Sequence, residues 1–141
     1  MVERISPKQA MARLEEGWTY VDVRSVPEFE QGHPAGAYNV PLMHMGAAGM
    51  APNPEFLSVM QERFPTDARL VLGCRSGARS LRAAEMLEAA GFEHVVDQRA
   101  GWDGARDPFG RELEPGWRGE GLASAMEAEP GRSWDALSKG V

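Results

Sequence analysis

The chain has 141 residues, of which 43% are hydrophobic and 26% charged, and its formal net charge at pH 7 is −6. This length suits one domain with a hydrophobic core and is short for two. The acidic balance argues against a general nucleic-acid or anionic-membrane binder, because such proteins present a basic surface.

The amino-terminal stretch contains no apolar segment of signal-peptide length. No part of the sequence approaches the roughly 20 apolar residues that a membrane-spanning helix needs. We therefore expect a cytoplasmic protein.

The first half of the chain predicts one helix, one strand and a long irregular region. Ser6 and Pro7 suit the N-cap and first position of a helix over Lys8–Glu15. The β-branched and aromatic residues of Thr19–Val23 indicate a strand. Glycine and proline then predict loops, with a short extended piece over residues 37–40 and an excursion without regular structure over residues 43–54.

The second half alternates helices with strands. Helical spacing of apolar residues predicts a helix over Pro54–Arg63, and Arg69–Gly73 indicates a buried parallel strand. A second helix is expected over Ser80–Ala90, a strand over His94–Asp97 and a short helix over Gly101–Arg106. This order predicts an α/β fold with a small parallel sheet flanked by helices on both faces.

Residues 1–108 are expected to form the domain, and residues 109–141 a C-terminal extension of uncertain order. Glycine, proline and charged residues dominate this extension, so we expect a loosely held segment from about Met126. Trp117 and Trp134 leave two alternatives, because they either fold the extension back or mark a partner surface.

The only cysteine of the chain, Cys74, lies in the stretch GCRSGARS between the expected strand and helix. A single cysteine forms no internal disulfide, so Cys74 is either a buried, inert residue or a reactive thiol. The reactive alternative is favoured by its position at the carboxyl end of a strand, where open α/β sheets bind ligands.

The residues after Cys74 predict an anion-binding loop. Backbone N–H groups at a helix start have no intrahelical acceptor, and Gly77 permits the tight turn that directs them inward. Arg69, Arg75, Arg79 and Arg82 form a run without acidic residues. A helix start and neighbouring arginines lower a thiol pKa, so we expect an ionised, solvent-reachable sulfur.

Asp22 and Arg24 end the predicted strand Thr19–Val23 and should lie at the same edge as Cys74. We expect them to support the loop or its neighbours, although Arg24 and Glu28 form an equally plausible surface ion pair. His33 lies between glycine and proline and is interpreted as a hydrogen-bonded loop support.

The loop CRSGARS resembles the active loop of the rhodanese family, C-x-x-G-x-R-S, and DVRSVPEFEQGHPAGAYNVP over residues 22–41 is similar to that family's upstream signature. Trp102 after Ala100 and Gly101 resembles a further family segment. The short chain is most similar to small single-domain thiosulfate sulfurtransferases. Pro34 departs from the pattern, because it stiffens the turn and lacks an N–H donor.

The resemblance implies that Cys74 attacks a small anionic sulfur donor such as thiosulfate and holds a persulfide. Cyanide or a thiol then accepts the sulfur, without a metal or organic cofactor, a nucleic acid or a membrane. The substrate-binding residues would be Arg75, Ser76, Gly77, Ala78, Arg79 and Ser80.

Two alternatives to this enzyme stay open. One is a relay or binding module that carries a persulfide without significant thiosulfate turnover. The other is a cysteine phosphatase or arsenate reductase, which also holds a thiolate among amides. The phosphatase pattern places an arginine six residues after the cysteine, where this chain has Ser80.

Overall fold

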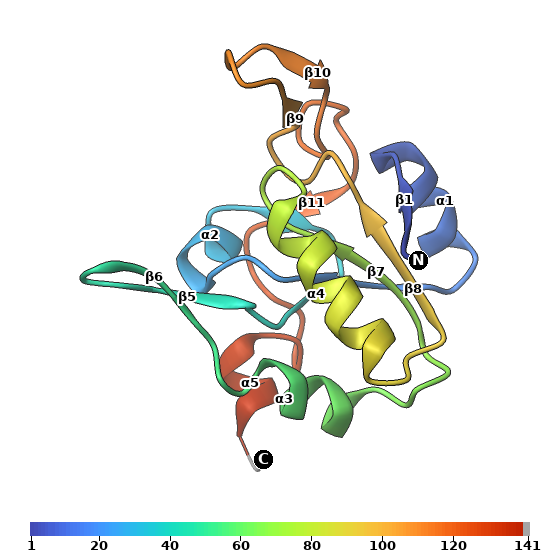
Figure 1. Ribbon diagram of the computed structural model, residues 1–141, viewed down its shortest axis with the longest axis vertical. Helices are drawn as coiled ribbons and strands as arrows, with labels where there is room; N and C mark the ends of the chain where they lie inside the picture. Colours follow the sequence, from blue (N-terminus) through green and yellow to red (C-terminus); the bar gives the residue numbers. More distant parts are fainter. Residues whose placement is uncertain (140–141) are drawn as a thin grey trace.

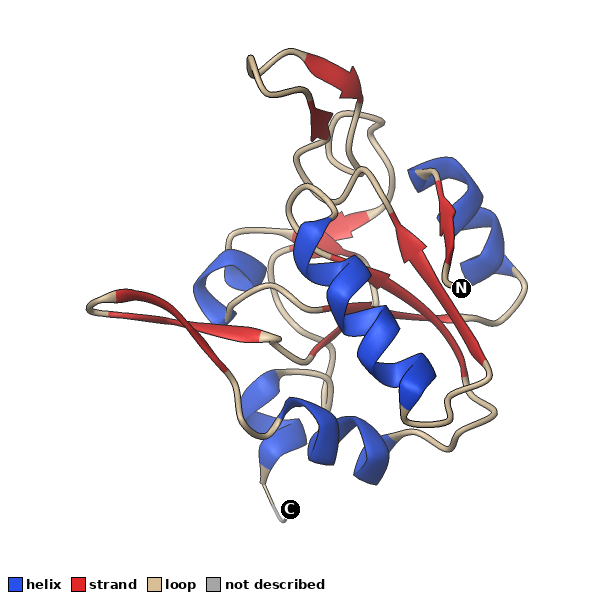
Figure 2. Ribbon diagram, in the orientation of Figure 1, coloured by secondary structure: helices blue, strands red, loops and turns tan. Residues whose placement is uncertain are grey.

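A five-stranded parallel sheet forms the centre of the computed structural model, which describes residues 1–139 (Figures 1 and 2). Its strand order is β1-β8-β7-β2-β4, and every neighbouring pair is parallel. The strands are β1 (Glu3–Ile5), β8 (His94–Gln98), β7 (Arg69–Gly73), β2 (Thr19–Asp22) and β4 (Tyr38–Asn39). The expected α/β fold is therefore confirmed.

Side chains alternate between the two faces of the sheet, as the period of two in a strand requires. Val21, Leu70 and Leu72 pack in one hydrophobic cluster with α3 (Phe56–Arg63) and α4 (Ala78–Ala89). Tyr20 and Val71 pack in a second cluster on the other face, with α1 (Pro7–Glu15) and α2 (Val26–Glu30). Helices thus cover both faces.

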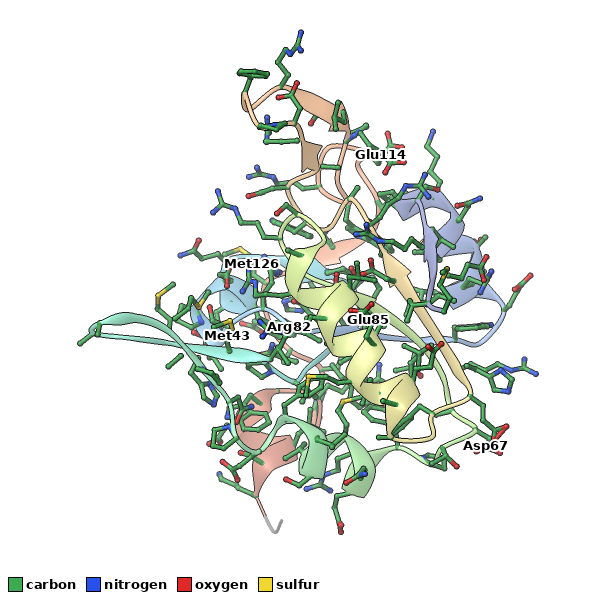
Figure 3. All side chains as sticks on the ribbon, in the orientation of Figure 1. Met43, Asp67, Arg82, Glu85, Glu114 and Met126 are labelled. Carbon is green, nitrogen blue, oxygen red and sulfur yellow. The ribbon has the colours of Figure 1, made fainter. Side chains whose placement is uncertain are left out.

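The predicted helices form where their caps and apolar stripes indicate. Ser6 caps α1 by accepting from the N–H of Gln9 at 3.1 Å, and Gln9 Oε1 accepts from the N–H of Ser6 at 2.9 Å. Helix α4 begins two residues earlier than expected and ends before Gly91. Its charged Arg82 and Glu85, labelled in Figure 3, lie on the exposed face.

Several short elements were not predicted. Strand β1 has only three residues, which is too short for a periodic signal. Helix α2 lies within the region expected to be mostly loop, and Ser25 starts it with a capping box to Glu28. The excursion over residues 43–54 was wrongly expected to be irregular, because β5 (Met43–Gly46) and β6 (Gly49–Pro52) form an antiparallel hairpin there.

The hairpin β5–β6 projects from the body of the molecule (Figure 1). Met45 and Met50 pair across it and are exposed, whereas Met43 packs against the core. Met43 therefore contributes to core packing, whereas Met45 and Met50 do not.

The short helix expected over Gly101–Arg106 is also wrong. Turns occupy most of this segment, and it ends in β9 (Ala105–Arg106), which pairs with β10 (Glu112–Glu114). Gly101 and Gly104 both have positive φ, which interrupts a right-handed helix. Glu114, labelled in Figure 3, lies at the end of β10 and pairs with Arg99 at 2.9 Å.

The C-terminal extension folds back onto the domain, and the expectation of a loosely held segment is wrong for residues 126–139. Strand β11 (Ser124–Ala125) pairs with β3 (His33–Pro34), and α5 (Trp134–Ser138) follows it. Trp117 and Leu137 are buried, and Trp134 packs against the core. Residues 140 and 141 lie outside the described residues.

None of the helices within residues 1–139 combines the length and hydropathy needed to cross a membrane.

Candidate active site

Cys74 follows directly after β7, at the carboxyl edge of the central sheet. Strand β7 ends at Gly73 and α4 begins at Ala78, so residues 74–77 form the connection. Gly73 lies opposite Asp22 in the parallel pairing. The ends of β7 and β2 therefore lie at one edge, as the sequence predicted.

The sulfur of Cys74 accepts a hydrogen bond from the backbone N–H of Gly77, with an N–Sγ distance of 3.1 Å. Gly77 has a φ of 105°, in the left-handed region. A Cβ at this position would also collide with the carbonyl oxygen of Arg99. The hydrogen bond to the sulfur therefore depends on glycine at residue 77.

The expectation that this sulfur is open to solvent is wrong. Cys74 is only 3% exposed and belongs to the hydrophobic cluster on the α3 and α4 face. Gly101 lies directly against the backbone of Cys74 and Arg75 on another side. Access to the sulfur is therefore narrow.

Backbone hydrogen bonds hold the first two carbonyls of the loop. The N–H of Trp102 donates to the carbonyl of Cys74 at 2.8 Å, and the N–H of Asp103 donates to that of Arg75 at 2.9 Å. In a planar trans peptide the C=O and the following N–H point in opposite directions. The N–H groups of Arg75 and Ser76 are thus turned away from the segment Gly101–Asp103.

The carbonyl of Gly77 is held by two side chains, one from the next turn of the chain and one from its distant amino-terminal strand. Arg4 Nη2 donates to it at 3.3 Å, and Ser80 Oγ at 3.4 Å. Since Arg4 comes from β1, the edge strand ties the loop to the sheet. The same peptide geometry turns the N–H of Ala78 away from Arg4.

A buried carboxylate holds Arg4 in this position. Arg4 Nε donates to Asp97 Oδ2 at 2.7 Å. Burial raises the pKa of the Asp97 carboxyl, and Arg4 opposes that shift. Asp97 Oδ1 is buried and has no hydrogen-bond partner among residues 1–139.

The guanidinium of Arg79 is bound to the carboxylate of Glu28 and is therefore not free to contact a ligand beside the loop. Its Nη1 and Nη2 donate to the two carboxylate oxygens of Glu28 at 2.8 and 3.0 Å. Burial alone raises the pKa of Glu28, but hydrogen bonds from Arg79 and Ser25 outweigh it and lower the value to about 2. The pair joins α4 to α2.

Asp22 and Arg24 form a buried ion pair, with Arg24 Nη2 2.7 Å from Asp22 Oδ2. Arg24 also donates to the carbonyl of Gly32 at 2.6 Å and lies over the Trp102 ring at 5.2 Å. Burial alone lowers the pKa of Arg24, but the charge and hydrogen bonds of Asp22 raise it by more, so the net shift is upward. The pair therefore contacts Trp102, whose N–H donates to the carbonyl of Cys74, and an Arg24–Glu28 ion pair does not form.

His33 is buried and stacks on Phe29 with ring centroids 3.6 Å apart. Its Nδ1 lies 2.8 Å from the carbonyl oxygen of Phe29. These contacts agree with the interpretation of His33 as a loop support.

A pocket of about 340 Å³ opens beside the loop. It is lined by Arg24, Glu28, Gln31, Arg75, Trp102, Asp103 and Arg118. Across it, Asp103 Oδ2 accepts from Arg75 at 2.8 Å and Asp103 Oδ1 from Arg118 at 2.9 Å. We call this set of contacts the Arg75–Asp103–Arg118 bridge.

The positive region around Cys74 differs from the one expected. Arg69 lies at the opposite end of β7, and Arg82 lies on the exposed face of α4. Glu28 and Asp103 compensate the two arginines that do lie beside the loop. The acid-free run in the sequence is therefore not an acid-free region in space.

Four residues that shape the site were missed: Arg4, Asp97, Asp103 and Arg118. Asp103 follows Trp102, so the family-like segment pointed close to it. Arg4, Asp97 and Arg118 have no local signal, because their contacts join residues far apart in the chain.

No group of three or more His, Cys, Asp or Glu side chains that could hold a metal ion occurs within the described part of the chain.

Comparisons with known proteins agree with the fold and the Cys74 loop described above. The model of the rhodanese-like domain matches residues 6–107. Thiosulfate sulfurtransferase 16, chloroplastic, from Arabidopsis thaliana is 45% identical over 86 residues, which cover 61% of this chain and 72% of that protein. Senescence-associated protein DIN1 from Raphanus sativus is 42% identical over 86 residues, again 61% of this chain, but the match spans only 47% of that protein.

A solved structure shows the same fold. The crystal structure of Rv0390 from M. tuberculosis matches with a TM-score of 0.74 and 29% identity, and covers 89% of this chain and 98% of that one. The fold, the Cys74 loop and the matched residues lead to one conclusion: the chain belongs to the rhodanese-like sulfurtransferase family.

Proposed function

We propose that the protein is a thiosulfate sulfurtransferase that carries a sulfane sulfur as a persulfide on Cys74. The observation that carries this proposal is the hydrogen bond from the N–H of Gly77 to Cys74 Sγ at 3.1 Å. That donor faces the sulfur at a helix start, where a negative charge is favoured. The name of the Arabidopsis relative supports thiosulfate as the donor.

In the first half-reaction the thiolate of Cys74 attacks the outer sulfur of thiosulfate. The S–S bond of thiosulfate breaks, its electron pair leaves with sulfite, and a new S–S bond forms on Cys74. Because Cys74 is 3% exposed, the narrow access favours a donor whose reacting atom lies at its end. The outer sulfur of thiosulfate is such an atom.

In the second half-reaction the acceptor attacks the outer sulfur of the persulfide. The S–S bond breaks and its electron pair returns to Cys74 Sγ. The sulfur leaves as thiocyanate when the acceptor is cyanide, or as a new persulfide when it is a thiolate.

The residues of the loop divide between two roles in this proposal. The N–H groups of Arg75, Ser76, Gly77 and Ala78 stabilise the anionic sulfur, because the carbonyls of the loop are held on the opposite side. Arg75, which is exposed, attracts the dianionic donor. Arg79 holds α4 against α2 through Glu28, and Ser80 holds the carbonyl of Gly77.

The position of Arg79 disfavours a phosphatase. A phosphate-binding loop needs a guanidinium free to contact the phosphoryl oxygens. Here Arg79 is bound through both Nη atoms to Glu28, with its side chain 18% exposed. We expect no vanadate-sensitive hydrolysis of an aryl phosphate.

Intact mass measurement tests the proposal. We expect incubation with thiosulfate to add one sulfur atom, and cyanide to remove it. Because Cys74 is the only cysteine, any persulfide adduct is assigned without mapping. The Cys74→Ser variant should form no adduct.

Each other outcome has a defined meaning. A wild-type protein that forms no adduct with thiosulfate contradicts the proposed activity. A protein that forms the adduct but shows no catalytic turnover of thiosulfate with cyanide would instead favour a persulfide relay.

A further inference from the structure

A second pocket lies beyond the Arg75–Asp103–Arg118 bridge. Its volume is about 500 Å³, and its lining is Arg75, Ser76, Asp103, Gly104, Arg106 and Arg118. It shares the three residues of the bridge with the first pocket. The two pockets therefore adjoin, and Ser76 of the active loop lies in the wall of the second.

The second pocket is basic in an acidic protein. Three arginines face one carboxylate there, whereas the whole chain carries a net charge of −6. Asp103 already divides its two oxygens between Arg75 and Arg118, and Arg106 Nη1 donates to the carbonyl of Gly110 at 3.2 Å. Since a guanidinium has several N–H donors, each arginine keeps donors for an anion.

The C-terminal extension places Arg118 in this pocket with a fixed backbone. The N–H of Trp117 donates to the carbonyl of Gly101 at 2.8 Å, and the N–H of Arg118 to that of Trp102 at 3.2 Å. Trp117 is fully buried, while the side chain of Arg118 is 67% exposed. Arg118 also lies outside residues 6–107, which the family model matches.

We propose that the second pocket binds the carboxylates of the sulfur acceptor, and that this acceptor is a small organic thiol with one or more carboxylate groups. This inference rests on the proposed sulfur transfer. The pocket is larger than thiosulfate or cyanide requires, and its lining includes Arg75 and Ser76, the two residues that follow Cys74. In this proposal Arg106 and Arg118 hold the carboxylates of the acceptor, and its thiol reaches Cys74 past Arg75 and Ser76, which line the pocket.

The chemical step is the acceptor half-reaction. The thiolate of the acceptor bonds to the outer sulfur of the Cys74 persulfide, the S–S bond to Cys74 breaks, and its electron pair returns to Cys74 Sγ. The product leaves as the persulfide of the carboxylate-bearing thiol. The arginines bind and orient the acceptor and take no part in the bond changes.

Single-turnover unloading tests this inference. Protein loaded with thiosulfate and freed of excess donor is mixed with mercaptosuccinate, which is anionic, or with 2-mercaptoethanol, which is neutral. Loss of the sulfur adduct is followed by intact mass. Comparing the ratio of the two rates between variants cancels the intrinsic reactivity of each thiol.

We expect Arg106→Gln and Arg118→Gln each to lower the ratio of mercaptosuccinate to mercaptoethanol rates by about two- to fivefold, the range for exposed charge pairs. Added salt should reduce the wild-type ratio as well, because it screens exposed charges. The matched control is Arg111→Gln on the same extension. Arg111 pairs with Asp107 and lines neither pocket, so its ratio should equal that of the wild type.

Binding of succinate, which has no thiol, tests the pocket independently of sulfur chemistry. In amide NMR spectra of the unloaded protein we expect shifts at residues 75–76 and 104–106 that weaken in Arg118→Gln. Unchanged rate ratios in both pocket variants, or no succinate shifts in this region, would overturn the inference. Failure of thiosulfate to load Cys74 would contradict the proposed function alone, since succinate binding is measured without it.

Discussion

The arginines around the Cys74 loop differ in burial, and we call the two sets the buried side and the exposed side. Arg24 and Arg79 form the buried side, with side chains 4% and 18% exposed, and each binds a carboxylate through two nitrogen atoms. Arg75 and Arg118 form the exposed side, with side chains 66% and 67% exposed, and share Asp103 through one hydrogen bond each. The sequence alone makes these arginines look alike.

The difference in burial explains why the arginines of the two sides have different roles. Removing a charge from water is costly, so a buried arginine must keep its carboxylate and cannot exchange it for a substrate. An exposed arginine loses little when it changes partner. We therefore interpret the buried pairs as the scaffold of the loop and the exposed bridge as its substrate-facing side.

The largest effect should come from breaking the buried side. Arg24→Met leaves Asp22 buried without its partner, and we expect a loss of about 3–5 kcal/mol in the free energy of unfolding. Urea unfolding measures it. Arg111→Met, at a side chain 80% exposed, should cost less than about 0.5 kcal/mol. Similar losses in both variants would remove the distinction between the two sides.

Gly77→Ala tests the backbone between the two sides. The positive φ alone should cost about 1–2 kcal/mol, and the collision with Arg99 should add to it. Gly91→Ala is the matched control, because Gly91 has a φ of 100° and nothing within 4 Å of the added Cβ. Urea unfolding should show the larger loss for Gly77→Ala, and thiosulfate loading should slow only in that variant.

Acid should weaken the Arg79 side through Glu28. Its pKa falls from an ordinary 4.5 to about 2 in the folded protein, so the folded state holds fewer protons than the unfolded state between these values. The contribution to stability is full above pH 4.5 and is lost as the pH falls toward 2.

Glu28→Gln should therefore flatten the fall of stability across that pH window, measured by urea unfolding at several pH values. Glu62→Gln, on the exposed face of α3, provides the control. If both variants keep the wild-type slope, Glu28 is not the group that senses this window.

The smallest effect on stability is expected on the exposed side. Arg75→Gln should change the free energy of unfolding by less than about 1 kcal/mol, because the bridge is solvated. The rate of thiosulfate loading should nevertheless fall about two- to fivefold, as expected for loss of one exposed charge contact. A large loss of stability with unchanged loading would reverse the roles assigned to the two sides.

Local signals were enough to predict the elements on which the loop is built. Ser6 and Pro7 mark α1, the apolar run Arg69–Gly73 marks β7, and Gly91 ends α4 with a φ of 100°. The position of Cys74 at a strand end followed from these elements.

The remaining features depend on contacts that no local pattern contains. Strand β1 exists because residues 3–5 pair with β8, more than 90 residues later. The loop carbonyls are held by Trp102, Asp103 and Arg4, which come from other segments. The burial of Cys74 likewise arises from the packing of these segments, so an exposed thiol was expected from the loop alone.

The indole of Trp117 has a consequence for how far the protein can be shortened. It is fully buried, meets the Tyr20 ring edge-on at 5.4 Å and donates through Nε1 to the carbonyl of Ala123 at 2.9 Å. The family match ends at residue 107. A fragment that ended there would lack the Trp117 side chain and would have a cavity of about that size beneath its sheet. We expect such a fragment to aggregate during expression, and the smallest soluble version of this protein to retain the chain beyond Ala123.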